Sequence, residues 1–124
     1  MKGVDIYPIK IAHSDERRDI LEMFNGNFNC KQVKILKVRK GNTLGNHFHN
    51  YRENRYLLKG KILYYLENVD TKEQETFIME EGYIMITDKR IAHTGIFLKD
   101  SIIIEGTEEV YTSGEVNDKI YKLK

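Results

Sequence analysis

The sequence predicts an all-β protein, a sandwich or a barrel, for which a double-sheet jelly roll fits the length best. Turn-forming pairs such as Asn25-Gly26 and Glu81-Gly82 recur at even spacing along the chain. The segments between the turns are about five to nine residues long, and several alternate between apolar and polar side chains as strands do. The 124 residues fit a single domain.

The strands that we expect follow from this alternation. In residues 31–39, Val33 and Ile35 share one face, and Leu36 and Val38 share the other, so both faces are half apolar. Such a strand is typical of a sheet that is packed on both sides. We expect further strands at 60–67, 76–79, 83–86, 90–98, 101–105 and 108–111.

Only residues 14–24 have a helical pattern. Ser14 is an acceptable N-cap, and Ile20 and Leu21 would lie on one apolar stripe. A short strand across residues 19–24 is the alternative. We predict a short helix or turn here, so the fold contains at most one short N-terminal helix.

The charge balance and the cysteine content argue against several classes of protein. Lys and Arg number 20 and Asp and Glu 19, and this near balance argues against a basic nucleic-acid module and against a polybasic binder of membrane surfaces. The single cysteine, Cys30, cannot form an internal disulfide. The N-terminus lacks the apolar segment of a signal peptide, and no apolar run is long enough to span a membrane. We therefore expect a cytoplasmic protein that binds neither nucleic acid nor membrane.

Three histidines and a glutamate are candidate metal ligands: His47, His49, Glu53 and His93. Side chains alternate along a strand, so His47 and His49 point to the same side. A tight turn after His49 would bring the Glu53 carboxylate to the same point, and His93 would close the site from a distant strand. Such a set suits one divalent transition metal, Fe, Mn, Zn, Ni or Co, and leaves a coordination position open.

The segment that holds three of these residues resembles the first motif of the cupin superfamily. That motif is a glycine, five residues, HxH, three residues, a glutamate, six residues and a glycine. The matching positions in this chain are Gly41, His47, His49, Glu53 and Gly60.

The second cupin motif is half present. Gly82 and His93 stand at the right spacing. Asp88 and Arg90 replace a proline and a glycine of the motif, and Phe97 replaces an asparagine. The histidine ligand is intact, whereas the departures affect the turn and the pocket wall beside the metal.

The resemblance covers most of the chain, about residues 28–111. It implies a small single-domain metal-binding cupin of the RmlC-like type. The implied fold is a double-stranded β-helix, a conical jelly-roll barrel of two antiparallel sheets with the metal deep inside its mouth. Residues 1–27 are then an N-terminal arm or strand, which in cupins often pairs across a dimer, and residues 28–124 are one barrel domain with a short C-terminal tail. We therefore expect a homodimer.

Three further residues are candidate contacts for a small-molecule substrate: Arg39, Arg55 and Phe97. Arg55 has the same parity as Glu53 and points either into the barrel or to the rim. A guanidinium buried there would need an anionic partner. Arg39 ends the strand before the first motif, where it lines the mouth or lies in solvent. Phe97 has the parity of His93 and would present an apolar wall.

The functional expectation rests on the site, because one fold hosts many functions. Residues 15–22, DERRDILE, followed by GNHFH at 45–49, are similar to the small cupins of nucleotide-sugar and surface-polysaccharide biosynthesis. We predict a metal-dependent enzyme of the isomerase or epimerase type that acts on a small polar, carbohydrate-like substrate. A mononuclear metal dioxygenase and a non-catalytic sugar- or metal-binding cupin are the alternatives.

Overall fold

The structure is a computed structural model that describes all residues, 1–124, and it is built almost entirely of antiparallel β-strands. The elements are β1 (Val4–Pro8), β2 (Lys10–Ser14), β3 (Asp19–Glu22), β4 (Gln32–Val38), β5 (Thr43–Phe48), β6 (Glu53–Lys59), β7 (Lys61–Asn68), β8 (Gln74–Glu80), β9 (Tyr83–Thr87), β10 (Ile91–Phe97), β11 (Ser101–Thr107), α1 (Gly114–Asn117) and β12 (Lys119–Ile120). None of its helical structure has the length and hydropathy that crossing a membrane requires.

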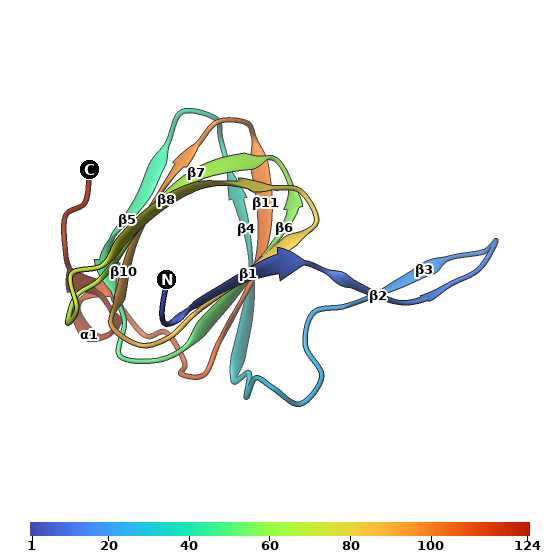
Figure 1. Cartoon of the computed structure of the whole chain (residues 1–124), viewed down its shortest axis with the longest axis horizontal. Helices are drawn as coiled ribbons and strands as arrows, with labels where there is room; N and C mark the ends of the chain where they lie inside the picture. The colour runs from blue at the N-terminus through green and yellow to red at the C-terminus, as the bar shows by residue number, and fades with distance from the viewer.

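Two five-stranded sheets form the barrel (Figure 1). One has the strand order β1-β9-β6-β11-β4, and the other has the order β12-β5-β10-β7-β8. From β4 to β7 the chain changes sheet at every step, and it does so again from β8 to β12. This alternation between two facing sheets is the jelly roll that the sequence predicts.

The main apolar core is built from residues of both sheets and adjoins the main cavity. Leu57 of β6, Ile62 of β7 and Met85 of β9 are fully buried in one cluster. Tyr64, Ile103 and Phe97 belong to the same cluster and also line the main cavity. The core therefore supports the cavity directly.

Residues 14–24 do not form the short helix that we predicted: a turn begins at Asp15, the alternative strand is present at Asp19–Glu22, and the one short helix of the chain, α1, is near the C-terminus. Lys10–Ser14 and Asp19–Glu22 pair as a hairpin, which extends away from the barrel (Figure 1). The Asp15 carboxylate accepts hydrogen bonds from the backbone N–H groups of Arg17 and Arg18, at 2.8 and 3.1 Å, and so turns the chain back. An Asx turn at Asp15 thus replaces the N-cap expected at Ser14.

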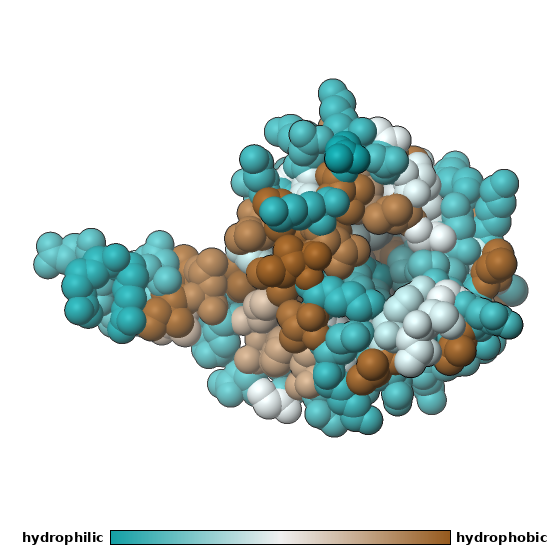
Figure 2. Space-filling model, turned by 180° about the vertical axis from the view of Figure 1, so that it is seen from behind, coloured by the Kyte–Doolittle hydropathy of each residue, from teal (hydrophilic) through white to brown (hydrophobic).

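The strand predicted at residues 108–111 and the packing predicted for both faces of the strand at 31–39 were also wrong. Residues 108–111 are irregular, because β11 ends at Thr107. The outer face of β4 is not packed: Val33 is 61% exposed and Ile35 is 66% exposed. Leu36 and Val38 face the barrel interior, so the alternating Val33 and Ile35 face outward, where no other part of the chain covers them. Apolar side chains are also exposed at the base of the hairpin and on the neighbouring barrel face (Figure 2).

Candidate functional site

The barrel contains a cavity of about 270 Å³, which is lined from both sheets and from the C-terminal tail. All four predicted metal ligands line it. Two of the three predicted substrate contacts, Arg55 and Phe97, line it as well. Arg39 is not among the lining residues and lies exposed in the turn after β4.

The histidines converge because β5 and β10 are paired neighbours. His47 lies opposite His93 in the register of these two strands, and His49 follows just beyond the end of β5. Their ring centroids are 4.7 to 5.3 Å apart, and the candidate ligand nitrogens all lie within 4.8 Å of one another. Gly45 permits this close approach: its φ is +114°, and an added Cβ would lie 2.4 Å from the carbonyl oxygen of His93.

An oxygen acceptor faces the Nδ1 atom of each histidine. His49 Nδ1 donates to the carbonyl oxygen of Asn117 at 3.0 Å, and Asp118 Oδ1 lies 3.3 Å away. His47 Nδ1 lies 3.7 Å from Asp118 Oδ2, and His93 Nδ1 lies 3.4 Å from the carbonyl oxygen of Ile91. These contacts favour the tautomer with its hydrogen on Nδ1, which leaves the lone pair of Nε2 free.

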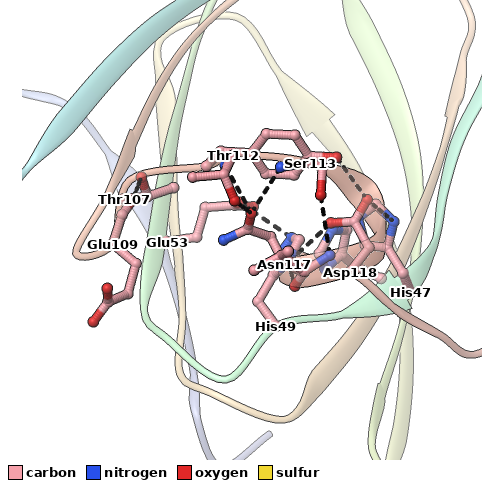
Figure 3. A network of polar contacts seen from close by, with 12 residues as sticks. His47, His49, Glu53, Thr107, Glu109, Thr112, Ser113, Asn117 and Asp118 are labelled. Atoms are coloured by element: carbon pink, nitrogen blue, oxygen red, sulfur yellow. Dashed lines mark hydrogen bonds and ion pairs between the residues drawn. The ribbon is translucent and has the colours of Figure 1, made fainter.

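The C-terminal tail supplies Asp118, a site residue that the sequence analysis missed. The side-chain oxygen of Asn117 accepts hydrogen bonds from the backbone of Thr112 and Ser113, at 2.7 and 3.1 Å (Figure 3). The Ser113 hydroxyl caps α1, and β12 pairs with β5 directly after Asp118. The tail is therefore fastened on both sides of this carboxylate.

Burial keeps the three imidazoles neutral at pH 7. It lowers the pKa of His49 to about 4 and the pKa of His93 well below its usual value. Burial also lowers the pKa of His47, although the carboxylate of Asp118 acts in the opposite direction. The positive charge of Arg55 lowers all three pKa values further.

Glu53 and Arg55 point into the cavity from the same face of β6, and both are buried. The guanidinium Nη2 contacts the Glu53 carboxylate and donates to His93 Nε2 at 2.9 Å. Its Nε lies 3.5 Å from Glu105 Oε2, on the residue opposite Arg55 in the pairing of β6 with β11. Glu53 Oε2 also lies 3.4 Å from His49 Nε2. The guanidinium therefore has the anionic partners that burial requires.

These contacts decide whether the four predicted ligands fit a metal ion. Three imidazoles and a carboxylate are suitable donors in kind. However, the lone pair of His93 Nε2 accepts a hydrogen bond from Arg55, and the Glu53 carboxylate pairs with the same guanidinium. Two of the four donors are thus engaged by a cation of the chain itself. As arranged here, the four side chains do not fit a metal held by all of them.

Further side chains at the cavity were missed because the cues were weak. Tyr51 stacks on His49 with ring centroids 4.8 Å apart, and Tyr111 donates a hydrogen bond to Asp118 at 3.0 Å. Lys34 lies over the Tyr111 ring at 4.0 Å. The parity of Lys34 with Leu36 on β4 could have placed it. Nothing in the sequence near Tyr111 indicates that the tail returns to the histidines.

No family model and no curated protein sequence matches the chain, whereas solved structures do. The TDP-quinovose 3,4-ketoisomerase WlaRB from Campylobacter jejuni aligns with a TM-score of 0.84 and 15% identity, over 97% of this chain and 94% of that one. The 3,4-ketoisomerase QdtA from Thermoanaerobacterium thermosaccharolyticum aligns with a TM-score of 0.77 and 18% identity, over 96% and 88%.

A third solved structure is the 3'-monoepimerase ChmJ from Streptomyces bikiniensis. It aligns with a TM-score of 0.76 and 18% identity, over 89% of this chain and 66% of that one. At such identities the likeness establishes the fold alone. It confirms the jelly roll that the resemblance to the cupins predicted.

Proposed function

We propose that this cupin-fold chain is an isomerase or epimerase that moves a proton at a carbon beside a carbonyl group in a sugar substrate. The observation that carries the proposal is a neutral imidazole, His47, with a carboxylate oxygen 3.7 Å from its Nδ1, facing a cavity that also contains a buried guanidinium. Proton transfer beside a carbonyl is promoted by a base that accepts the proton and by a hydrogen-bond donor or positive group that stabilises the oxygen. Both kinds of group line this cavity.

His47 is the best-placed base. Its side chain is 23% exposed, whereas those of His49 and His93 are nearly inaccessible. Its Nδ1 faces Asp118, so Nε2 is the atom that accepts a proton. The carboxylate then stabilises the imidazolium that forms.

The proposed reaction balances without an oxidant or reductant. The C–H bond breaks, its proton moves to His47 Nε2, and its electron pair forms an enolate with the carbonyl group. Return of the proton to the neighbouring carbon, with the matching shift between the two oxygens, moves the carbonyl group. If His47 keeps the abstracted proton and a second acid on the opposite face gives its own proton to the same carbon, that carbon is inverted. The two outcomes are isomerisation and epimerisation.

The substrate that we propose is a keto sugar linked to a nucleotide. Solved structures of QdtA contain TDP and TDP-4-keto-6-deoxyglucose, and one of ChmJ contains dTDP-quinovose. The cavity of about 270 Å³ is near the lower limit for ligand pockets, so it would enclose the sugar ring and leave the nucleotide outside.

Deuterium exchange tests this proposal. The protein is incubated in D₂O with TDP-4-keto-6-deoxyglucose, and C–H protons beside the keto group are followed by NMR. We expect exchange with wild type and a loss of roughly 100-fold or more with His47→Asn. His13→Asn, on the exposed hairpin, is the matched control and keeps the wild-type rate.

Two results would contradict the proposal that the chain is an isomerase or epimerase. An unchanged rate in His47→Asn would remove the assigned base. A ligand-dependent rise in melting temperature without exchange, for this sugar and its isomers, would favour the non-catalytic sugar-binding alternative.

We also propose that the chain forms a homodimer. A two-stranded hairpin is marginally stable alone in water, yet β2 and β3 form a sheet of their own and have extensive contacts only with each other. Val33 and Ile35 leave a second apolar surface uncovered on β4. Contact with a second copy would cover such surfaces, as in other symmetric oligomers.

A further inference from the structure

We infer that Arg55 takes the place of the predicted metal ion, holding Glu53 and His93 and offering its remaining N–H groups to a substrate oxygen. The chain thereby carries its own cation at the centre of a histidine-rich site. The first part of this inference stands on geometry alone. The contact with a substrate oxygen rests on the proposed function.

The position of Arg55 is fixed by the sheet. It lies in β6, a strand with hydrogen-bonded neighbours on both sides, opposite Met85 of β9 and Glu105 of β11. Strand parity directs its side chain into the barrel with that of Glu53. The guanidinium is anchored on a rigid element, as a group that must act at a fixed point requires.

The hydrogen bonds of the guanidinium are only partly used by the protein. Nη2 serves Glu53 and His93, and Nε faces Glu105. Nη1 is buried and has no hydrogen-bond partner, although the side chain lines the cavity. A buried, charged donor without an acceptor is costly, so the unpartnered Nη1 indicates a ligand oxygen.

The same contacts oppose a metal ion. A metal would need the Nε2 lone pair of His93, which already accepts a hydrogen bond from Nη2. It would also need the Glu53 carboxylate, the counter-ion of the buried guanidinium. A divalent ion there would leave Arg55 unpaired beside a second positive charge. The guanidinium of Arg55 and a metal ion would therefore compete for His93 Nε2 and for the Glu53 carboxylate.

A guanidinium can perform the electrostatic task for which a metal is used in such reactions. The carbonyl oxygen gains negative charge as the proton leaves the carbon. A charge-assisted hydrogen bond from Nη1 would stabilise that oxygen without a change of the protein's geometry. Arg55 would then touch the reacting atoms, while Glu53 and Glu105 act as positioning residues.

Cobalt binding tests the replacement without any assay of turnover. Wild type, Arg55→Met and Arg55→Met/His93→Ala are stripped with chelator and titrated with Co²⁺, and the visible absorption of bound cobalt is recorded. We expect well under one equivalent bound in wild type. In Arg55→Met we expect about one equivalent, with affinity higher on the order of 100-fold. The double variant loses this site.

The wild-type titration alone can overturn the inference. One equivalent of Co²⁺ or Zn²⁺ held at micromolar concentration, and weakened by Glu53→Gln, would show that the four residues ligate a metal despite Arg55. This result remains informative if Arg55→Met fails to fold. An unchanged cobalt affinity in a folded Arg55→Met would equally contradict the competition.

The deuterium-exchange assay tests the substrate contact and separates the two proposals. We expect Arg55→Met to lower the maximal exchange rate roughly 100-fold, with partial rescue in Arg55→Lys, which keeps the charge. If wild type exchanges and Arg55→Met matches it, the role of Arg55 fails while the proposed function stands. If wild type shows no exchange but the cobalt results are as expected, the proposed function and the substrate contact fail while the replacement of the metal stands.

Discussion

One face of β6 passes from the polar cavity into the apolar core within five residues, through Glu53, Arg55 and Leu57. Burial barely changes along it, since Arg55 is 4% exposed and Leu57 is 0% exposed. The means of stabilisation changes completely. Leu57 is stabilised by contact with apolar neighbours in any direction, whereas Arg55 depends on two carboxylates at particular positions.

This contrast explains where function resides in the barrel. Burial of apolar side chains stabilises the fold roughly in proportion to the buried area, but these side chains have no groups that could take part in catalysis. The cavity buries charges that compensate one another incompletely, and Nη1 of Arg55 is left without a partner. The apolar core must therefore supply the stability that offsets the incompletely paired charges in the cavity.

The largest effect on stability that we predict comes from truncation of the core side chain Leu57. Leu57→Ala should lower the free energy of unfolding by about 2–5 kcal/mol, because it removes apolar contacts and leaves a cavity. Its neighbour Leu58, which is 48% exposed, is the matched control, and Leu58→Ala should change stability by about 0.5 kcal/mol or less. Urea unfolding measures both. Equal effects would contradict the division between core and surface.

Because the histidines are buried in their neutral form, we predict that the free energy of unfolding falls at acid pH. The folded state holds the pKa of His49 near 4, below its unfolded value, so the unfolded state binds more protons between about pH 6.5 and 4. Stability is therefore complete above about pH 6.5 and falls as the pH approaches 4, by about 3 kcal/mol from this residue.

Urea unfolding at a series of pH values measures this dependence. His49→Gln should flatten part of the profile, because glutamine does not titrate. A wild-type stability that is constant between pH 7 and 4 would contradict neutral, buried imidazoles.

The ion pair beside the core offers a double-variant test. Glu53→Gln should cost about 1–3 kcal/mol, because it leaves the buried Arg55 with a weaker partner. Adding Arg55→Met should recover much of the loss, since an apolar side chain replaces the unpaired charge. Urea unfolding of both single variants and the double variant gives the coupling energy. Simple additivity would mean that the two side chains are independent.

The parts of the site that follow local rules could be predicted from the sequence. The HxH spacing and strand parity brought His47 and His49 together. Parity also put Arg55 on the same face as Glu53, but it left open whether Arg55 points into the barrel or lies at the rim. The contact between Arg55 and His93 could not be predicted, because it depends on how two sheets face each other.

The misread segments depended on context that a local pattern does not contain. Ser14 resembles an N-cap, yet the carboxylate of Asp15 closes a hairpin instead. The alternation in β4 is real, but which of its faces is covered depends on where the second sheet lies, and only the inner face with Leu36 and Val38 packs against the core. Asp118 comes from a tail whose return to the histidines is set by β12 pairing with β5.

The β2–β3 hairpin lies outside the barrel. Within one chain it is stabilised neither by apolar burial, as Leu57 is, nor by buried ion pairs, as Arg55 is. Ile11 and Leu21 face each other across this hairpin and are exposed, Ile11 at 58%. We expect Ile11→Ser/Leu21→Ser to shift a dimer to monomers in sedimentation equilibrium while the unfolding of the monomer changes by about 0.5 kcal/mol or less. Ile78→Ser, at a comparably exposed position on β8, is the control that should stay dimeric. A wild type that is monomeric at high concentration, or a dimer broken only by Ile78→Ser, would exclude the hairpin as the interface.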